Sequence, residues 1–163
     1  MSHHITLCYD KHLLQRAVFR FWWRVVGIRL VIVLVVTAAG LVVLVADGNT
    51  SWFVGVLATV LAFGIATMVA LYITHYRHAL QVLKKMGAPE GTFTASESSL
   101  SLSSGAGSGT FPWSAVTELW QYPDHWLMFF SKSQFVTLPL ADFSPEAKAF
   151  VLERVRASGG KIV

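Results

Sequence analysis

The sequence predicts an α+β membrane protein in which a two-helix transmembrane hairpin is joined to a small cytoplasmic β-sheet domain capped by a C-terminal helix. Three observations predict this class: two long uncharged apolar runs, a later stretch of short alternating segments, and a capped helical pattern near the C-terminal end. The expected boundaries are 1–24 for an N-terminal strand and amphipathic helix, 25–86 for the hairpin with a cytoplasmic extension, and 91–163 for the sheet domain.

The two apolar runs are Leu30–Ala46 and Trp52–Thr74, and the polar break Asp47–Ser51 separates them. As helices, their 17 and 23 residues would be ~26 and ~35 Å long, against a hydrocarbon core of ~30 Å. The first run becomes long enough if 25–28 join it and Arg29 extends its guanidinium toward the headgroups. The sequence therefore predicts two membrane spans.

Charged residues next to these runs predict the orientation of the hairpin. Lys and Arg crowd both outer ends of the runs, whereas the connecting break carries only Asp47. Because short cytoplasmic loops are enriched in Lys and Arg, both termini should be cytoplasmic. Basic and aromatic residues near the ends of the two runs, the inner end at the break included, are the candidate membrane-interface residues: Arg16, Arg20, Trp22, Trp23, Arg24, Arg29, Trp52 and Arg77.

Composition excludes several other classes. The net charge of +4 comes mainly from residues beside the spans, where anionic lipid attracts them, so we expect no nucleic-acid partner. Cys8 is the single cysteine, which excludes an intrachain disulfide and a CxxC metal site. About 25 mostly polar or aromatic residues precede the first run, which argues against a signal peptide and for a retained anchor.

Small residues within the second run form the stripe Ala58, Ala62 and Ala66, which allows close helix contact. Two interpretations stay open: packing between the helices of the hairpin, or assembly into a homo-oligomer. Neither run contains Asp, Glu, Lys, Arg or His, so a proton relay or a coupling-ion site is not expected, and neither is a transporter.

Local signals place the ends of the helices. Asp10 can cap a helix that starts at Lys11, and Gly87 ends the extension of the second span. Ser144, followed by Pro145, predicts the start of the C-terminal helix. A short strand is expected at Ile5–Tyr9 from its alternating pattern.

The region after residue 90 reads as strands and turns. Short serine-rich or aromatic segments, bounded by turn residues, predict strands at Gly91–Ala95, Ser98–Ser103, Val116–Tyr122, Trp126–Phe130 and Phe135–Pro139. Flexible turns are expected at Ser104–Gly109 and Ser131–Gln134.

Nearly the whole chain resembles the YcxB-like family of small bacterial membrane proteins. The resemblance rests on the N-terminal strand and helix before a two-span hairpin, and on three later stretches in this order: Phe111–Val116, Trp126–Phe130 and Val136–Phe143. Pro112, Trp113 and Ser114 match the core signature of the family. The family has a basic residue where this chain has Leu140. The resemblance implies a pleckstrin-homology-like soluble domain, and the bacterial family together with the predicted spans gives an expected location in the bacterial inner membrane. On physical grounds, a tryptophan just after a proline is most simply a core anchor, so the indole N–H of Trp113 should donate to a carbonyl.

Residues that could carry chemistry are few. His75 and His78 share a helix face, but no carboxylate or cysteine is near them in sequence, so no metal site is expected. The sequence has no Gly-x-Ser-x-Gly, its carboxylates are scattered, and Asp124-His125 lies in an expected turn. We therefore expect neither an enzyme nor a cofactor.

The sequence favours a non-enzymatic protein whose hairpin anchors a cytoplasmic interaction domain in the lipid bilayer. Its expected partner is another protein. One alternative is an immunity protein that binds a membrane-acting or secreted toxin. A second is a lipid-sensing module based on the basic helix Lys11–Arg29.

Overall fold

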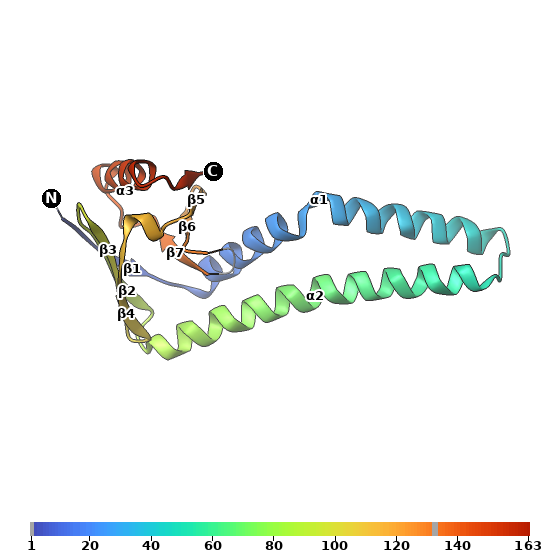
Figure 1. The fold of residues 1–163 in the computed structure, drawn as a ribbon. Helices are drawn as coiled ribbons and strands as arrows, with labels where there is room; N and C mark the ends of the chain where they lie inside the picture. The colour runs from blue at the N-terminus through green and yellow to red at the C-terminus, as the bar shows by residue number, and fades with distance from the viewer. Residues whose placement is uncertain (1, 132–133) are drawn as a thin grey trace. The chain divides into compact units, whose positions relative to one another are not determined.

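The computed structural model describes residues 2–131 and 134–163. Figure 1 shows the order of its helices and strands along the chain. The elements are β1 (His3–Cys8), α1 (Lys11–Ala46), α2 (Trp52–Met86), β2 (Glu90–Ala95), β3 (Ser99–Ser104), β4 (Gly107–Pro112), the 3₁₀ helix η1 (Trp113–Ala115), β5 (Glu118–Gln121), β6 (His125–Phe129), β7 (Phe135–Pro139), α3 (Pro145–Ala157) and β8 (Lys161–Ile162).

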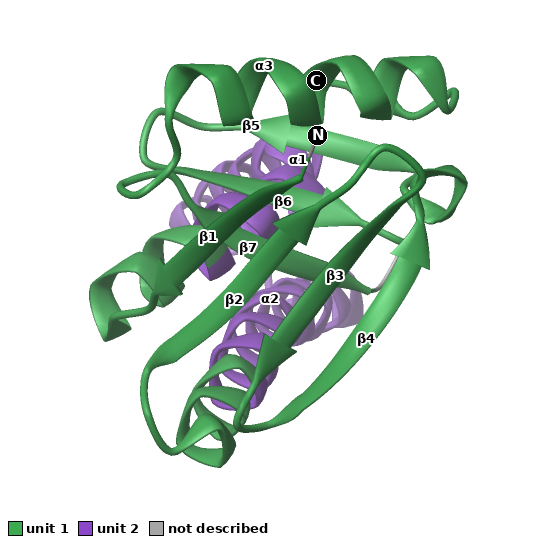
Figure 2. Cartoon of the chain, turned by 90° about the vertical axis from the view of Figure 1, so that its left-hand side faces the viewer, with its two compact units in different colours: residues 1–17, 79–163 green, residues 18–78 purple. Residues whose placement is uncertain are grey.

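The chain divides into two compact units, which Figure 2 colours separately. The sheet unit consists of 1–17 and 79–163, and the hairpin unit of 18–78. The N-terminal strand, which the sequence placed in a separate segment 1–24, pairs with β2 and so belongs to the sheet unit. Helices α1 and α2 each contribute residues to both units.

Both long helices follow the local signals. The carboxylate of Asp10 accepts a hydrogen bond from the backbone N–H of Leu13, which caps α1 as expected. Gly87, at φ +73°, follows the last residue of α2. Gly27, at φ 71° and ψ 151°, interrupts α1 with a non-helical residue that the apolar pattern did not predict. A non-glycine residue would be strained at this φ.

The described part of the sheet unit contains two four-stranded sheets. The first is antiparallel with the order β1-β2-β3-β4, and the second has the order β7-β6-β5-β8. In the second sheet β8 runs parallel to β5, while the other pairs are antiparallel. The hydroxyl of Tyr9, which follows β1, donates to the backbone oxygen of Thr137 in β7 at 3.1 Å and so links the two sheets.

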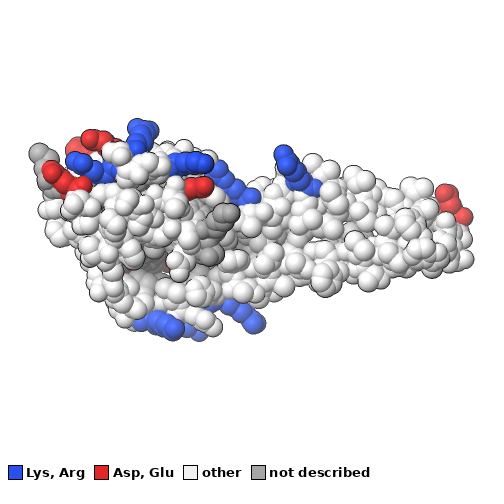
Figure 3. Space-filling model, viewed as in Figure 1, with Lys and Arg blue, Asp and Glu red and all other residues white. Residues whose placement is uncertain are grey.

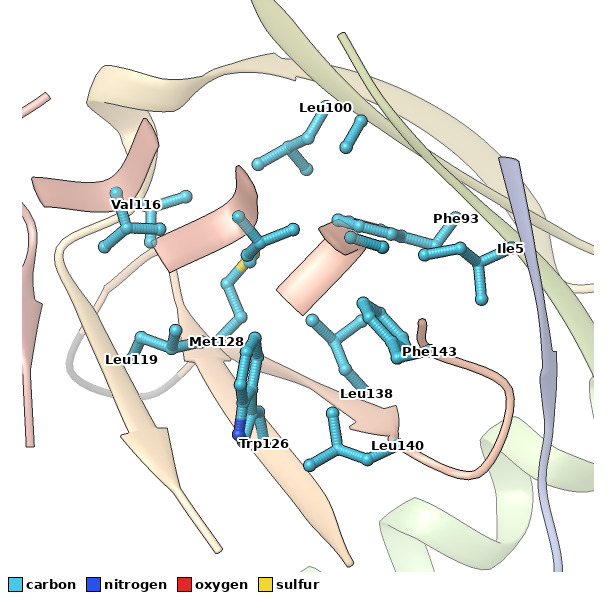
Figure 4. Packing of buried hydrophobic residues seen from close by; sticks show 14 of the residues in the cluster. Ile5, Phe93, Leu100, Val116, Leu119, Trp126, Met128, Leu138, Leu140 and Phe143 are labelled. Carbon is cyan, nitrogen blue, oxygen red and sulfur yellow. The ribbon is translucent and has the colours of Figure 1, made fainter. Parts of the chain in front are cut away.

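One hydrophobic cluster joins both sheets and α3. Figure 4 shows Phe93 from the first sheet facing the same interior as Leu138 and Met128 from the second. Val151 of α3 is fully buried in this cluster. Ser144 accepts a hydrogen bond from the N–H of Ala147, so the capped helix start predicted from the sequence is present.

Parts of the sheets also differ from the sequence prediction. The expected turn Ser104–Gly109 is shorter, because β4 already begins at Gly107 and pairs with β3 from there. The short strand β8 was not predicted, since two residues give no periodic pattern. Of the expected turn Ser131–Gln134, residues 132 and 133 lie outside the described part of the chain.

Candidate functional site

The hairpin unit carries the largest exposed apolar surface of the described chain. Within the described residues, α1 and α2 are the two helices long and apolar enough to cross a membrane, and their most apolar windows contain no buried residue. In the part of the chain that the structure describes, all large exposed apolar side chains except Val82, Phe111 and Val163 lie in 18–78. In the sheet unit, by contrast, the apolar side chains form a core.

Charge is distributed unevenly along the hairpin unit. In Figure 3 its closed end carries an acidic residue and no basic one, in agreement with Asp47 in the connection. Trp52 begins α2 at this end and is 79% exposed. Trp23, Arg24, Arg29 and Arg77 are also exposed and lie nearer the open end in sequence. Aromatic residues therefore occur near both ends of the apolar surface, as in proteins with interfacial belts.

Trp22 differs from the other candidate interface residues, because it contacts the opposite helix. Its indole N–H donates to the backbone oxygen of Met68 at 3.0 Å, and its ring meets Tyr72 edge-on at 5.9 Å. Phe21 and His75 make a similar edge contact at 5.1 Å. His75 thus packs within the hairpin, and among the described residues no group of three or more His, Cys, Asp or Glu could hold a metal ion.

The two helices lie close together at Gly64. A Cβ at this position would lie 2.8 Å from a methyl carbon of Leu34, so the glycine makes room for that side chain. Nearby, an open groove of about 330 Å³ lies between the helices and is lined by apolar residues such as Leu61, Met68 and Ala38.

The stripe of small residues does not contribute to this contact. Ala58, Ala62 and Ala66 are all exposed, whereas Leu61, Gly64 and Met68 are the half-buried residues of this stretch. The expectation that the stripe packs inside the hairpin is therefore not met. Its other interpretation, a homo-oligomer, stays a prediction.

Arg16 belongs to the sheet unit and forms an ion pair there. Its Nε donates to Oδ2 of Asp124 at 2.8 Å. The other carboxylate oxygen of Asp124 lies 2.9 Å from Nδ1 of His125, whose side chain is completely buried at the start of β6. The sequence assigned Asp124-His125 to a turn and Arg16 to the lipid interface. Arg16 and Asp124 are 108 positions apart in the chain and meet only in the folded structure. No local sequence pattern could therefore have predicted this ion pair.

The signature residues Pro112, Trp113 and Ser114 lie in different environments. Trp113 is buried, and its indole N–H donates to the backbone oxygen of Ser96 at 2.8 Å, as expected for a core anchor. Pro112 ends β4 and precedes η1, and Ser114 lies inside η1; both are exposed. The signature thus contributes one side chain to the core and two to the surface.

Two titratable groups of the first strand region have perturbed acidities. Desolvation by burial raises the pKa of the Tyr9 phenol well above its ordinary value. Desolvation, followed by the carboxylates of Asp142 and Glu90, raises the pKa of the exposed Cys8 thiol. A thiol with a raised pKa is a poor nucleophile, so these neighbours do not activate Cys8.

Comparisons with known proteins identify part of the sheet unit. Residues 96–153 match the family model described as YcxB-like protein, which confirms the resemblance seen in the sequence. The match runs from the turn before β3 into α3 and does not include the hairpin. No curated protein and no solved structure matched the chain.

Proposed function

From this YcxB-like segment and the apolar hairpin, we propose that the chain is a non-enzymatic protein of the bacterial inner membrane. Helices α1 and α2 span the bilayer, both termini lie in the cytoplasm, and the sheet unit is an interaction domain that binds another protein.

The exposed apolar surface of 18–78 carries this proposal. Soluble proteins rarely expose contiguous apolar patches larger than a few hundred Å². Here whole helical windows without a buried residue are apolar on all sides. Such a surface is stable in hydrocarbon, where a helix also satisfies its own backbone hydrogen bonds.

The orientation rests on charge. The connection between the helices carries Asp47 and no Lys or Arg, whereas basic residues such as Arg29 and Arg77 lie on the other side of the spans. The positive-inside rule then places the connection in the periplasm.

The architecture of the sheet unit and one of its ion pairs support the proposed role. Two four-stranded sheets and α3 share one core, an arrangement compatible with the pleckstrin-homology-like fold that the family resemblance implies. The ion pair between Arg16 and Asp124 engages one of the basic residues on which the lipid-sensing alternative depends. Protein binding is therefore the preferred role.

Two single-cysteine variants test the topology. Both carry Cys8→Ser, and each adds one cysteine: Thr50→Cys in the connection or Ser98→Cys in the exposed turn after β2. A membrane-impermeant maleimide applied to intact cells should label the cysteine at 50. It should label the cysteine at 98 only after the inner membrane is permeabilised, and both proteins should stay in the membrane after alkaline carbonate extraction.

Release of both variants by carbonate would show that the hairpin does not span the membrane. Labelling at position 98 in intact cells would show the opposite orientation. Wild-type protein with Cys8 alone is a poor control for this assay, because its cysteine lies at a third position, in β1. The Cys8→Ser protein without an added cysteine is the matched control.

A further inference from the structure

Strand β4 is an edge strand of the first sheet. Its register with β3 continues without a bulge from Gly107, opposite Ser104, to Pro112, opposite Ser99. It contains no charged residue, and Figure 2 shows it at one end of the layer. Soluble proteins usually protect such an edge with lysine, a bulge or a covering element. β4 has no lysine and no bulge, and its one protective residue is the proline at its end.

The outward-facing backbone groups of β4 follow from the turn between β2 and β3. The backbone oxygen of Ser99 accepts from the N–H of Ser96 at 2.9 Å, so the backbone groups of Ser99 point toward β2. In an antiparallel ladder these directions alternate along the strand. Leu100 and Leu102 therefore bond to β4, through their partners Phe111 and Gly109.

The same alternation turns the N–H and C=O groups of Ser108 and Thr110 away from β3. The hydroxyl groups of Thr110 and Ser101 lie 2.8 Å apart. This agrees with a non-hydrogen-bonded pair, in which the side chains of opposite residues lie closer together. Both Ser108 and Thr110 are exposed, and the described residues supply no backbone partner on the outer side.

Of the other edge strands, β1 and β7 contact each other and β8 is short. β1 lies against β7, and the oxygen of Thr137 in β7 accepts the hydroxyl of Tyr9. β8 has two residues. β4, with six residues, is therefore a long edge without a backbone partner on its outer side among the described residues.

We propose that β4 joins two copies of this chain by antiparallel pairing across a two-fold axis at Gly109. In this register Ser108 lies opposite Thr110 of the second copy, and each exchanges its N–H and C=O bonds with the other. Gly109 lies opposite Gly109 of the second copy, in a pair whose side chains would approach most closely. Because glycine has no side chain, the two strands do not clash there. The strand has no charge that could repel its symmetry mate.

Side-chain sizes support the same register. Gly107 faces Phe111 of the second copy, so a residue without a side chain meets the largest one of the strand. Phe111 is 36% exposed and already lies over Gly109, where a Cβ would be 2.9 Å from the ring. Its ring also contacts Phe130 at 4.8 Å. Pairing would cover this aromatic contact from the open side.

This inference rests on the proposed role of the sheet unit as a protein-interaction domain and names a second copy as the partner. Anchoring in one membrane would raise the effective concentration of copies. It does not require the hairpin to span the bilayer, so the two proposals can fail separately.

Proline at position 110 tests the edge directly. Thr110→Pro removes an outward N–H but none of the bonds to β3, and Pro112 shows that the strand accepts proline at an outward-facing position. Thr110→Val keeps the N–H and is the matched control.

Two differently tagged full-length copies are expressed together and extracted from membranes in mild detergent. Their co-purification should fall at least about tenfold for Thr110→Pro, because each copy loses a donor and leaves an acceptor unpaired, and should be unchanged for Thr110→Val.

Cysteine crosslinking tests the register without relying on a proline variant. In a Cys8→Ser background, one tagged copy carries Ser108→Cys and the other Thr110→Cys. The mixed pair should form a disulfide, because directly opposite residues are ~5.5 Å apart between Cα atoms, within disulfide range. Either variant paired with itself should crosslink much less.

Equal co-purification of Thr110→Pro and Thr110→Val, no preference for the mixed cysteine pair, or capture of a different protein at these cysteines would each overturn the inference. A monomer that stays in carbonate-washed membranes would refute only the self-pairing. A β4-paired dimer that carbonate releases would refute only the membrane anchor.

Discussion

The two units use the same apolar residue types in opposite ways. In the sheet unit, side chains such as Phe93 and Leu127 are fully buried, and polar or small residues face outward. In the hairpin unit, Val36 and Phe63 are 64% and 74% exposed. Hydrophobic content alone therefore does not distinguish a core from an exposed apolar surface. The two are distinguished by whether the side chains point into a shared interior or outward.

This contrast separates two sources of stability. The sheet unit depends on burial away from water, which contributes roughly 25 cal/mol for each Å² of apolar area. Inside lipid the hydrophobic effect gives no such preference between helix contact and lipid contact. In the proposed membrane setting, the helices would associate through packing, as between Gly64 and Leu34, and through polar contacts.

The largest expected effect comes from truncating an aromatic side chain in the core. Phe93→Ala should lower the free energy of unfolding by ~3–5 kcal/mol, because it removes a fully buried ring and leaves a cavity. Val36→Ala in the hairpin should change it by less than ~0.5 kcal/mol, since its side chain contacts no core. Denaturant unfolding of the full-length protein in detergent, followed by tryptophan fluorescence, measures both. Similar losses for the two variants would contradict the contrast.

A charge on the hairpin should act on insertion rather than on the core. Phe63 lies in the middle of the apolar part of α2, and Phe63→Arg should disfavour insertion of this helix by ~2.5–3.5 kcal/mol relative to a neutral residue. The fraction of protein that resists carbonate extraction measures it, with Phe63→Leu as control. If Phe63→Arg leaves this fraction unchanged, the exposed surface of α2 does not face lipid.

Features set by neighbouring residues were predictable from the sequence. The limits of the apolar helices, the cap of α1 at Asp10 and the cap of α3 at Ser144 all follow from local patterns, and the structure has them. The strand β7 also has the predicted limits. Such features depend on periodicity and on single hydrogen bonds within one turn of the chain.

Features set by distant partners were not predictable in this way. The pairing of β1 with β2 brings His3 opposite Ala95 across the whole hairpin. Gly107 and Gly109 looked like part of a flexible turn, but pairing with β3 fixes them in a strand. The burial of His125 behind Asp124 likewise depends on tertiary contacts that no spacing in the sequence encodes. The composition of a segment cannot show which other segment will cover it.

The smallest expected effect compares two tryptophans that each donate one indole hydrogen bond to a backbone oxygen. Trp113 bonds to Ser96 in the sheet unit, and Trp22 bonds to Met68 in the hairpin. Trp113→Phe should cost about 1–3 kcal/mol of unfolding free energy, because the change removes the donor of a mostly buried bond. Trp22→Phe should cost less than about 1 kcal/mol, since the oxygen of Met68 lies inside α2 and keeps its intrahelical bond.

Trp23→Phe, at an exposed position of the same helix, controls for the loss of one indole. Thermal unfolding of the three variants in detergent, followed by circular dichroism, decides the order. A cost for Trp22→Phe equal to that for Trp113→Phe would show that the hairpin, like the sheet unit, depends on buried polar contacts for its stability.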